Sequence, residues 1–261
     1  MRIAVGVEYD GSGFRGWQTQ QEGVRTVQRE VEKALSFVAD HPVHVHCAGR
    51  TDAGVHAREQ VIHFETSVER PVKSWVMGGN VRLPDDVNLL WARPVPDHFH
   101  ARFSARFRSY RYRILNRPMR SALLHGRVTW IYRHLDAVSM HEAGRALTCT
   151  HDFTSYRAIA CQAKQPVRTV THLEVTQDGD IIELCIRANA FLHHMVRNIA
   201  GVLIAIGAGE QPVTWAREVL EHRDRTLGGV TAPPDGLYFE LVEYEDEFQL
   251  PRPHNGQVFY T

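Results

Sequence analysis

The sequence predicts an α+β protein whose strands pair mostly antiparallel. Segments with an apolar residue at every second position alternate with segments whose apolar residues recur at helical spacing. Two alternating runs flank Asp178-Gly179, a dipeptide that favours a tight hairpin turn. Hairpins join antiparallel strands, and strands interspersed with helices in this way are typical of the α+β class.

In the N-terminal half we expect a strand, a helix, a strand, a loop and a further strand. Met1 to Asp10 alternates like a strand, and a glycine-rich turn then leads to Thr26, a candidate helix N-cap. The face of the following helix collects five apolar residues, Val27, Val31, Ala34, Leu35 and Val38. The other elements expected here are strands at 43–47, 60–66 and 87–95 and a helix at 74–83, which two adjacent glycines weaken.

Residues 99–115 alternate so regularly that we expect one long strand joining two halves of the chain. Tyr110 and Tyr112 share one face of it, and Arg111 the other. The second half then repeats the order of elements, so we expect domains at 1–104 and 105–261. Its expected elements are a helix capped by Asp136 and reaching Leu147, a hairpin of 168–176 with 180–188, the longest helix at 190–208, a short helix at 214–222 and a strand at 237–244.

The composition narrows the class of protein. The chain has 261 residues, of which 43% are hydrophobic, enough for a substantial core. No apolar run is long enough to span a membrane and the first residues lack the apolar block of a signal peptide, so we expect a cytoplasmic protein with no membrane contact. The cysteines show no CxxC pair, and we expect reduced, buried thiols at Cys47, Cys149, Cys161 and Cys185.

Charge is segregated along the chain although its total cancels. Between Asp97 and Asp136 there are nine arginines and no lysine or acid, whereas Glu240 to Glu247 holds five acids and no base. Guanidinium groups bind phosphates in a bidentate manner, so contact with a nucleic acid is one interpretation of the basic segment. The alternative is a solvated strand and loop face, and composition does not decide between the two.

The segment AGRTDAGVHA, residues 48–57, combines a single carboxylate with a cation and two glycines. Asp52 follows Arg50, and Gly49 and Gly54 permit tight turning and the close approach of a ligand. A loop carboxylate beside a cation is suited to acid–base or nucleophilic chemistry. The alternative is a structural turn in which Asp52 caps backbone amides, and spacing alone leaves both open.

The stretch GRTDAGVHA resembles the motif of the tRNA pseudouridine synthase A (TruA) family, whose aspartate is essential to catalysis. Further resemblances follow in family order along nearly the whole chain: EYDG at Glu8, GWQ at Gly16, TVQ at Thr26, FHARFSA at Phe99, YRY at Tyr110, HDFTSYR at His151, RANAFLHHMVRNIAG at Arg187 and TAPPDGLY at Thr231. One departure is Glu59 before Gln60, where the family often has glycine. This difference affects loop mobility or RNA contact and does not change the expected chemistry.

This resemblance implies a pseudouridine synthase fold, with two ferredoxin-like halves that share a largely antiparallel central sheet, flanking helices and a basic cleft between the halves. It implies isomerisation of uridine to pseudouridine at positions 38 to 40 of the tRNA anticodon stem loop. The implied partner is tRNA, bound across both subunits of a homodimer. No cofactor and no metal are implied.

The resemblance also implies roles for five residues. Asp52 is the catalytic carboxylate, Arg197 pairs with it, and Tyr110 stacks on the target uracil. Leu237 helps to line the pocket, and Arg50 handles RNA or flips the base. The chemistry of these groups agrees, because a cation favours an ionised carboxylate and an aromatic ring can hold an extruded base.

Several alternatives stay open from the residues alone. Tyr110 also fits as one more core aromatic on an alternating strand. The carboxylate of Asp52 could attack C1′, attack C6 or remove a C2′ proton. Adjacent histidines at His193 and His194 match no zinc-enzyme motif, so we expect structural or RNA-contacting roles for them and no metal site.

Two other classes of protein compete with the synthase. A catalytically inactive tRNA-binding protein or RNA chaperone on the same scaffold would also carry the basic segment, but the intact set of Asp52, Tyr110 and Arg197 argues against it. A glycoside hydrolase also acts at an anomeric carbon, but it normally uses a second catalytic carboxylate, and none is evident beside Asp52.

Overall fold

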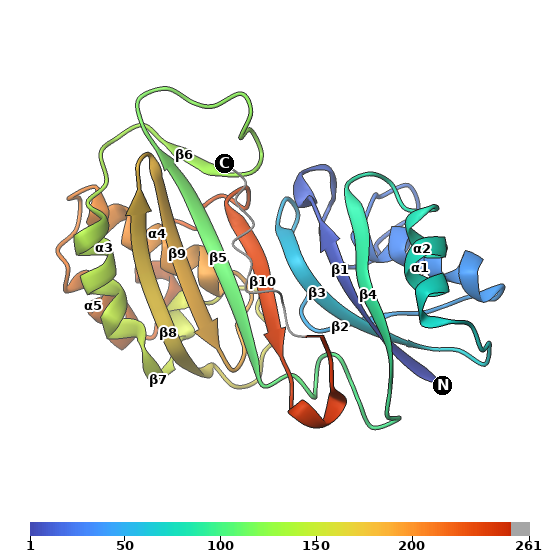
Figure 1. Cartoon of the computed structure of the whole chain (residues 1–261). Helices are drawn as coiled ribbons and strands as arrows, with labels where there is room; N and C mark the ends of the chain where they lie inside the picture. Colours follow the sequence, from blue (N-terminus) through green and yellow to red (C-terminus); the bar gives the residue numbers. More distant parts are fainter. Residues whose placement is uncertain (252–261) are drawn as a thin grey trace.

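A ten-stranded sheet runs through residues 1–251, the part of the chain that the structure, a computed structural model, describes (Figure 1). Its main path has the order β4-β1-β3-β10-β5-β9-β8-β7, with β2 added to β3 and β6 added to β5. The strands are β1 (Arg2–Tyr9), β2 (His46–Cys47), β3 (His56–Glu65), β4 (Val87–Val95), β5 (Phe107–Asn116), β6 (Thr129–Ile131), β7 (Cys149–Asp152), β8 (Val167–Asp178), β9 (Ile181–Ala188) and β10 (Leu237–Glu243).

Each half of the sheet is built from the same β-α-β-β-α-β sequence of elements. The helices are α1 (Val27–Ala39), α2 (Val72–Asn80), α3 (Ala137–Gly144), α4 (Met195–Gly207) and α5 (Trp215–His222). In the first half β1-α1-β2-β3-α2-β4 gives the strand order β4-β1-β3-β2, and in the second β5-α3-β8-β9-α4-β10 gives β10-β5-β9-β8. This arrangement confirms the α+β class and the two ferredoxin-like halves.

The halves meet where β3 and β10 run parallel, with Tyr238 opposite His56 and Phe239 opposite Ala57. Every other neighbouring pair on the main path of the sheet is antiparallel, as the hairpin signals predicted. Because the loop before β3 carries Asp52, this central pairing places that loop at the boundary between the halves.

Two hydrophobic cores lie against the sheet, one in each half. The first packs α1 against β1 through residues such as Val31 and Val5, and the second packs α4 against β5 and β9 through residues such as Ile199. Each fully buried aliphatic side chain of this kind contributes about 1.5–3 kcal/mol relative to an exposed one. Phe239 and Val242 of β10 belong to the first core, so the last strand ties the C-terminal half to the N-terminal one.

The expected single strand over 99–115 is wrong in its first part. β5 begins only at Phe107, and residues before it turn: Ser104 donates its backbone N–H to the carbonyl of His100 at 2.9 Å. The ring of His100 accepts a hydrogen bond from the backbone N–H of Arg102 at 3.1 Å. Phe99 is fully buried, so the apolar alternation there anchors a turn in the first core.

The expected helix over 190–208 is also shorter than predicted. α4 begins at Met195 and has 13 residues, the same length as α1. His194 precedes it with φ of 61°, a left-handed conformation that a residue with a Cβ rarely adopts and that costs on the order of 1–3 kcal/mol. Residues 190–194 therefore form an irregular segment that leads into the helix.

Of the predictions about helix caps and cysteines, some are confirmed by the structure and others are wrong. Asp136 caps α3 as predicted, accepting from the backbone N–H of Val138 at 3.0 Å. Thr26 occupies the N-cap position of α1, but its hydroxyl makes no capping hydrogen bond. The four cysteines are free as predicted, but the expected burial is wrong: Cys149 is exposed and the other three are only partly buried. Within residues 1–251, no helix has the length and apolar character needed to cross a bilayer.

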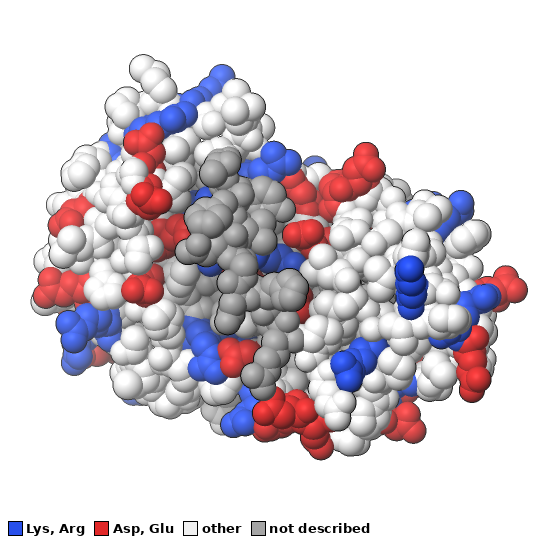
Figure 2. Space-filling view, in the orientation of Figure 1, with Lys and Arg blue, Asp and Glu red and all other residues white. Residues whose placement is uncertain are grey.

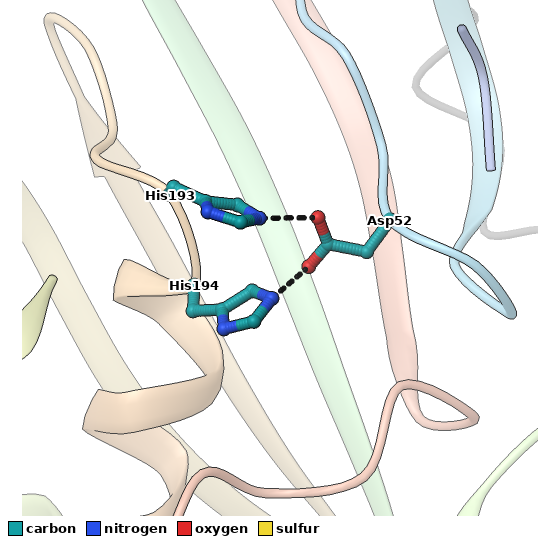
Figure 3. Close-up of side chains that lie close together, drawn as sticks. All are labelled: Asp52, His193 and His194. Carbon is teal, nitrogen blue, oxygen red and sulfur yellow. Dashed lines mark ion pairs between the residues drawn. The ribbon is translucent and has the colours of Figure 1, made fainter. Parts of the chain in front are cut away.

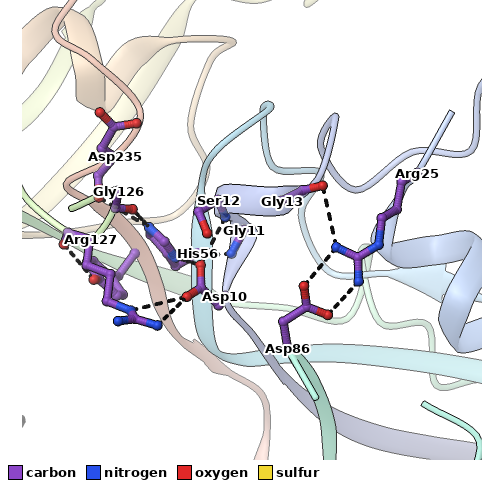
Figure 4. A network of polar contacts seen from close by, with 11 residues as sticks. Asp10, Gly11, Ser12, Gly13, Arg25, His56, Asp86, Gly126, Arg127 and Asp235 are labelled. Atoms are coloured by element: carbon purple, nitrogen blue, oxygen red, sulfur yellow. Dashed lines mark hydrogen bonds and ion pairs between the residues drawn. The ribbon is translucent and has the colours of Figure 1, made fainter. Parts of the chain in front are cut away.

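A polar network joins the two halves beside the central strands (Figure 4). Asp10 accepts from the guanidinium of Arg127 at 3.0 Å and lies 3.2 Å from Nδ1 of His56. Nε2 of His56 lies 2.9 Å from the carbonyl of Gly126 and 3.2 Å from that of Asp235. The hydrogen bond with His56 holds the pKa of Asp10 well below its ordinary value, despite the opposing effect of burial.

We expect Asp10→Asn to lower the free energy of unfolding by about 1–3 kcal/mol at pH 7, because it removes a charge-assisted contact between the halves. A carboxyl whose pKa is lowered by folding stabilises the folded state above its unfolded pKa. This contribution begins to decline as the pH falls below about 4 and is lost only as the pH falls through the lower pKa of the folded state. Urea unfolding at pH 7 and pH 3 measures both effects. The exposed Asp85→Asn is the control, and equal stability of Asp10→Asn and wild type at pH 7 would contradict this assignment.

Candidate active site

The loop between β2 and β3 that carries Asp52 is fixed from the side of β1. The carbonyl of Thr51 accepts a hydrogen bond from the backbone N–H of Trp17 at 3.0 Å, and the hydroxyl of Thr51 shares one with Tyr9 at 2.7 Å. Gly54 has φ of +79°, which glycine adopts without strain. These contacts hold the loop in one conformation, so the direction of the Asp52 side chain is set by the fold.

Three basic side chains from the C-terminal half surround the carboxylate of Asp52. Oδ2 accepts from Nη1 of Arg197 at 3.1 Å and lies 3.2 Å from Nε2 of His194. Oδ1 lies 3.2 Å from Nε2 of His193, and Figure 3 shows the two rings reaching the carboxylate from the segment that leads into α4. Residues far apart in sequence thus meet across the boundary between the halves.

Arg197 is the constant counterion of this cluster. Burial lowers the pKa of His194, and the nearby positive groups of His193 and Arg197 act in the same direction, against the raising effect of Asp52. A guanidinium stays protonated at any physiological pH. Arg197 therefore keeps a positive charge beside Oδ2 of Asp52 whatever the charge on the histidine.

A cavity of about 510 Å³ opens onto Asp52. That volume lies in the usual range for sites that bind small ligands. Both halves of the protein line it, through Arg15, Gly16, Trp17, Gln18, Gln20, Thr51, Asp52, Ala53, His194, Arg197 and Pro234. The carboxylate with its counterion is accordingly accessible to a ligand, with a quarter of the Asp52 side chain exposed.

Tyr110 lies on β5, close to the Asp52 loop but outside the residues that line the cavity. Its ring packs edge-to-face with Phe191 and with Phe239, each at 4.9 Å between ring centroids. A Cβ on Gly49 would lie 3.7 Å from the Tyr110 hydroxyl, so the loop passes directly over it. Burial, and then the neighbouring Tyr9 and Asp52, raises the pKa of this hydroxyl, which is protonated at neutral pH.

The other two residues expected in the site lie apart from the cavity lining. Leu237 is the first residue of β10 and is buried in the second core. Arg50 is exposed, and within residues 1–251 it forms no ion pair. Arg50 therefore has a guanidinium free for a ligand, whereas Leu237 contributes apolar packing beneath the site.

Two features of the site were not identified from the sequence. The contact of His193 and His194 with Asp52 was missed, although the paired histidines were noted, because nothing in their spacing indicates an aspartate more than a hundred residues away. Arg15 was also missed as a cavity residue. It is exposed beside the glycine-rich turn, whose composition was the available signal.

The same cluster is the one group within residues 1–251 whose ligand atoms are close enough to hold a metal ion. The side-chain ligand atoms of Asp52, His193 and His194 lie within 4.8 Å of one another. Two features favour an ion-pair cluster instead. Arg197 already places a cation on Oδ2, and in the described chain neither histidine donates its second ring nitrogen to an acceptor, as metal-bound histidines almost always do. The expectation of no metal stays a prediction.

The arginine-rich segment forms mostly ion pairs. Six of its nine arginines pair with acids elsewhere in the chain: Arg106, Arg111, Arg113, Arg117, Arg127 and Arg133. Positive and negative side chains are interspersed on the face of the molecule seen in Figure 2. Most of this segment therefore matches the alternative of a charged strand and loop face. Arg15 and Arg50 form no ion pair with the described residues, so their guanidinium groups are better placed to meet phosphates.

Comparison with known proteins decides the family. A family model described as tRNA pseudouridine synthase matches residues 6–104 and 143–245, most of the chain. The chain belongs to the tRNA pseudouridine synthase family. The resemblance seen in the sequence motifs is thereby confirmed. The stretch between the two matched segments, residues 105–142, contains β5, β6 and most of α3.

Curated relatives of this pseudouridine synthase family match over nearly their whole lengths. A tRNA pseudouridine synthase A of Pseudomonas aeruginosa is 60% identical over 100% of this chain and 91% of its own. One of Nitrosococcus oceani is 62% identical over 97% of each chain. One of Alcanivorax borkumensis is 57% identical over 99% of this chain and 97% of its own.

Proposed function

We propose that the protein isomerises uridine to pseudouridine in tRNA. The observation that carries this function is the Asp52 carboxylate, held 3.1 Å from the Arg197 guanidinium at an open cavity, in a chain of the pseudouridine synthase family. Relatives of this length and similarity are named tRNA pseudouridine synthase A. No observation supports the alternative of an inactive tRNA-binding protein or RNA chaperone.

In the reaction the bond from C1′ to N1 breaks, a bond from C1′ to C5 forms, C5 loses its proton and N1 gains one. We assign Asp52 as the catalytic carboxylate, because an ionised carboxylate can act as a nucleophile or a proton acceptor. Arg197 supplies a permanent positive charge 3.1 Å from that carboxylate. The walls contributed by both halves would retain the detached uracil between bond breaking and bond formation.

Tyr110 is assigned to the uracil itself. Its half-buried ring offers a surface on which an extruded base can stack, and its protonated hydroxyl is next to the loop of Asp52. Leu237 supports the pocket from the core, and Arg50 contacts RNA or assists base flipping. No metal and no organic cofactor take part in this scheme.

We propose that the target uridines are those at positions 38 to 40 of the anticodon stem loop. Flipping a base there costs less unstacking energy than in a rigid duplex, and several adjacent sites can be reached through shape and phosphate contacts. The test uses tRNA transcripts with a single uridine at position 38, 39 or 40 or in the acceptor stem, digested to nucleosides and analysed for pseudouridine. We expect product from the first three only, and equal product from the acceptor stem would refute the position assignment.

We also propose that the protein forms a homodimer, is cytoplasmic and divides into domains at 1–104 and 105–261. Residues 252–261 of the second domain lie outside the part of the chain that the structure describes. Exposed large apolar side chains between β5 and α3 support a protein interface, since burying them against a second copy would remove apolar surface from water. They are Met119, Leu123, Trp130 and Tyr132. Light scattering on the purified protein measures the mass, and a monomer at micromolar concentration would contradict the dimer.

We expect Arg50→Ala to weaken tRNA binding without affecting the chemical step. An exposed, unpaired guanidinium that contacts a phosphate releases a counterion on binding, so its removal should reduce the slope of log K against log salt concentration by about one. Filter binding across a salt series measures this slope. Arg70→Ala removes an exposed arginine near α2 and is the control. An identical slope for Arg50→Ala and wild type would exclude a phosphate contact.

A further inference from the structure

Arg108 is a buried cation that contacts no carboxylate in the part of the chain that the structure describes. Its residue surface is 9% exposed, and within residues 1–251 it forms no ion pair with an acid. Burying an unpaired charge is costly, and most buried arginines are matched by an acid. Arg111 and Arg113, on the opposite face of the same strand, follow that rule by pairing with Glu183. The burial of Arg108 therefore needs an explanation that an ion pair does not give.

The guanidinium of Arg108 is bound by three backbone carbonyls from three segments. Nε and Nη2 donate to the carbonyl of Ala48 at 3.3 and 3.1 Å, Nη2 also donates to that of Arg102 at 2.6 Å, and Nη1 donates to that of Asn189 at 3.0 Å. Because backbone carbonyls accept these bonds, the arrangement fixes the course of the chain at each of the three points.

Two of these carbonyls begin the segments that build the site. Ala48 stands four residues before Asp52, at the start of the catalytic loop, and Asn189 follows β9 and leads to the histidines and to Arg197. One side chain thus joins the N-terminal and the C-terminal contributions to the Asp52 cluster. Arg108 itself lies two residues before Tyr110, on the same face of β5.

Binding of an RNA phosphate does not explain Arg108. The side chain is buried, and Nε, Nη1 and Nη2 are each already engaged with protein carbonyls. Burial lowers the pKa of Arg108, yet a guanidinium remains charged at physiological pH. Its positive charge also lies near the Tyr110 hydroxyl, whose pKa it lowers against the larger effect of burial.

We propose that Arg108 is a positioning residue for the isomerisation, which locks the Asp52 loop against the segment carrying Arg197 through its bonds to Ala48 and Asn189. This inference rests on the proposed function. A planar guanidinium donates from three nitrogens and can bind carbonyls in several directions at once. The ammonium group of lysine has a single nitrogen and cannot reproduce this geometry. Charge alone is therefore insufficient, and lysine does not replace arginine here.

The test compares Arg108→Lys with wild type in steady-state and single-turnover assays on a tRNA transcript. We expect kcat to fall by about 10- to 100-fold, because a displacement of the reacting groups by about 1 Å has effects of that size. KM for tRNA should change less than about threefold, since the surface cations that meet phosphate are untouched. Amide hydrogen exchange should accelerate in the three segments that Arg108 joins, residues 48–55, 100–106 and 189–197, and stay unchanged elsewhere.

Arg113→Lys is the matched control, because Arg113 is an arginine of the same strand that faces away from the site and pairs with Glu183 at 3.0 Å. It should leave kcat and exchange in all three segments at wild-type values. A kcat for Arg108→Lys within twofold of wild type, or exchange that rises throughout the chain, would overturn the positioning role. Wild-type protein without activity in the same assay would instead count against the proposed function. The exchange measurement would still test whether Arg108 positions the segments that it joins.

Discussion

Replacing Asp52 by asparagine is expected to abolish pseudouridine formation while leaving tRNA binding nearly unchanged. The substitution keeps the size of the side chain and an oxygen that can accept from Arg197, so the loop should retain its conformation. It removes the negative charge that any of the three conceivable steps, attack at C1′, attack at C6 or removal of a C2′ proton, requires. We expect the rate to fall by more than about 10³-fold.

Nucleoside analysis of a tRNA transcript measures the rate for Asp52→Asn, and filter binding measures the dissociation constant. Asp85→Asn, which changes an exposed carboxylate outside the cavity lining, serves as control and should behave as wild type in both. Turnover by Asp52→Asn within tenfold of wild type would exclude the carboxylate from the chemistry. Loss of tRNA binding together with activity would show that Asp52 acts in recognition instead.

The second large effect is expected at Tyr110. Tyr110→Phe keeps the ring that packs against Phe191 and Phe239 but lacks the hydroxyl, so base stacking should persist. Because the hydroxyl is protonated, it can assist removal of the C5 proton only as a relay, accepting that proton while donating its own to a carboxylate such as Asp52; without this relay the step should slow by about 10²-fold. Tyr110→Ala loses both functions and leaves a void between the two phenylalanines, which should also cost about 3–5 kcal/mol of stability. Single-turnover rates with uridine and with C5-deuterated uridine measure the proton step.

Tyr112→Phe is the matched control for Tyr110→Phe. Tyr112 lies on the same face of β5, but its hydroxyl is buried and bonded to Thr129 at 2.6 Å and to the carbonyl of Pro233 at 2.8 Å. Its loss should lower stability by about 1–3 kcal/mol and leave the isotope effect unchanged. Equal rates for Tyr110→Phe and wild type would restrict Tyr110 to stacking.

Local sequence patterns predicted the strands and helices where side-chain period alone decides the structure. The alternation of β1 and β9 and the helical spacing of α1 are signals of this kind. The order of the strands in the sheet could not be predicted from these local patterns and came from the structure. The error at residues 99–106 has a specific cause. Hydrogen bonds of His100 and Ser104 turn the chain there, and a hydrophobic pattern carries no information about such bonds.

The charged residues illustrate the same limit at longer range. Arg111 is one of nine arginines in a segment without acids, but it contacts Glu183 and Glu240, which lie 72 and 129 residues further along the chain. Arg108 has similar neighbours in sequence, but it is buried and pairs with no acid among residues 1–251. Strand order and the face of the sheet decide whether an arginine is neutralised by an acid, stays free or positions other groups. Composition reveals neither of them.

For the site, the family motifs selected residues that the fold brings together only in part. Asp52 and Arg197, 145 residues apart, are in contact as the resemblance implied, whereas Leu237 lies in the core and Tyr110 beneath the loop. The positions of His193 and His194 could not be predicted, because they depend on the left-handed conformation of His194 immediately before α4. Backbone strain of this type leaves no signal in residue spacing.

Release of tritium from C5-labelled uridine in a tRNA transcript measures the proposed isomerisation most directly, since C5 loses its hydrogen only when the new bond to C1′ forms. Wild-type protein should release tritium in proportion to the pseudouridine formed, and Asp52→Asn should bind the same transcript and release none. Either absence of release by wild-type protein that has bound the transcript, or undiminished release by Asp52→Asn, would contradict an isomerase whose catalytic carboxylate is Asp52.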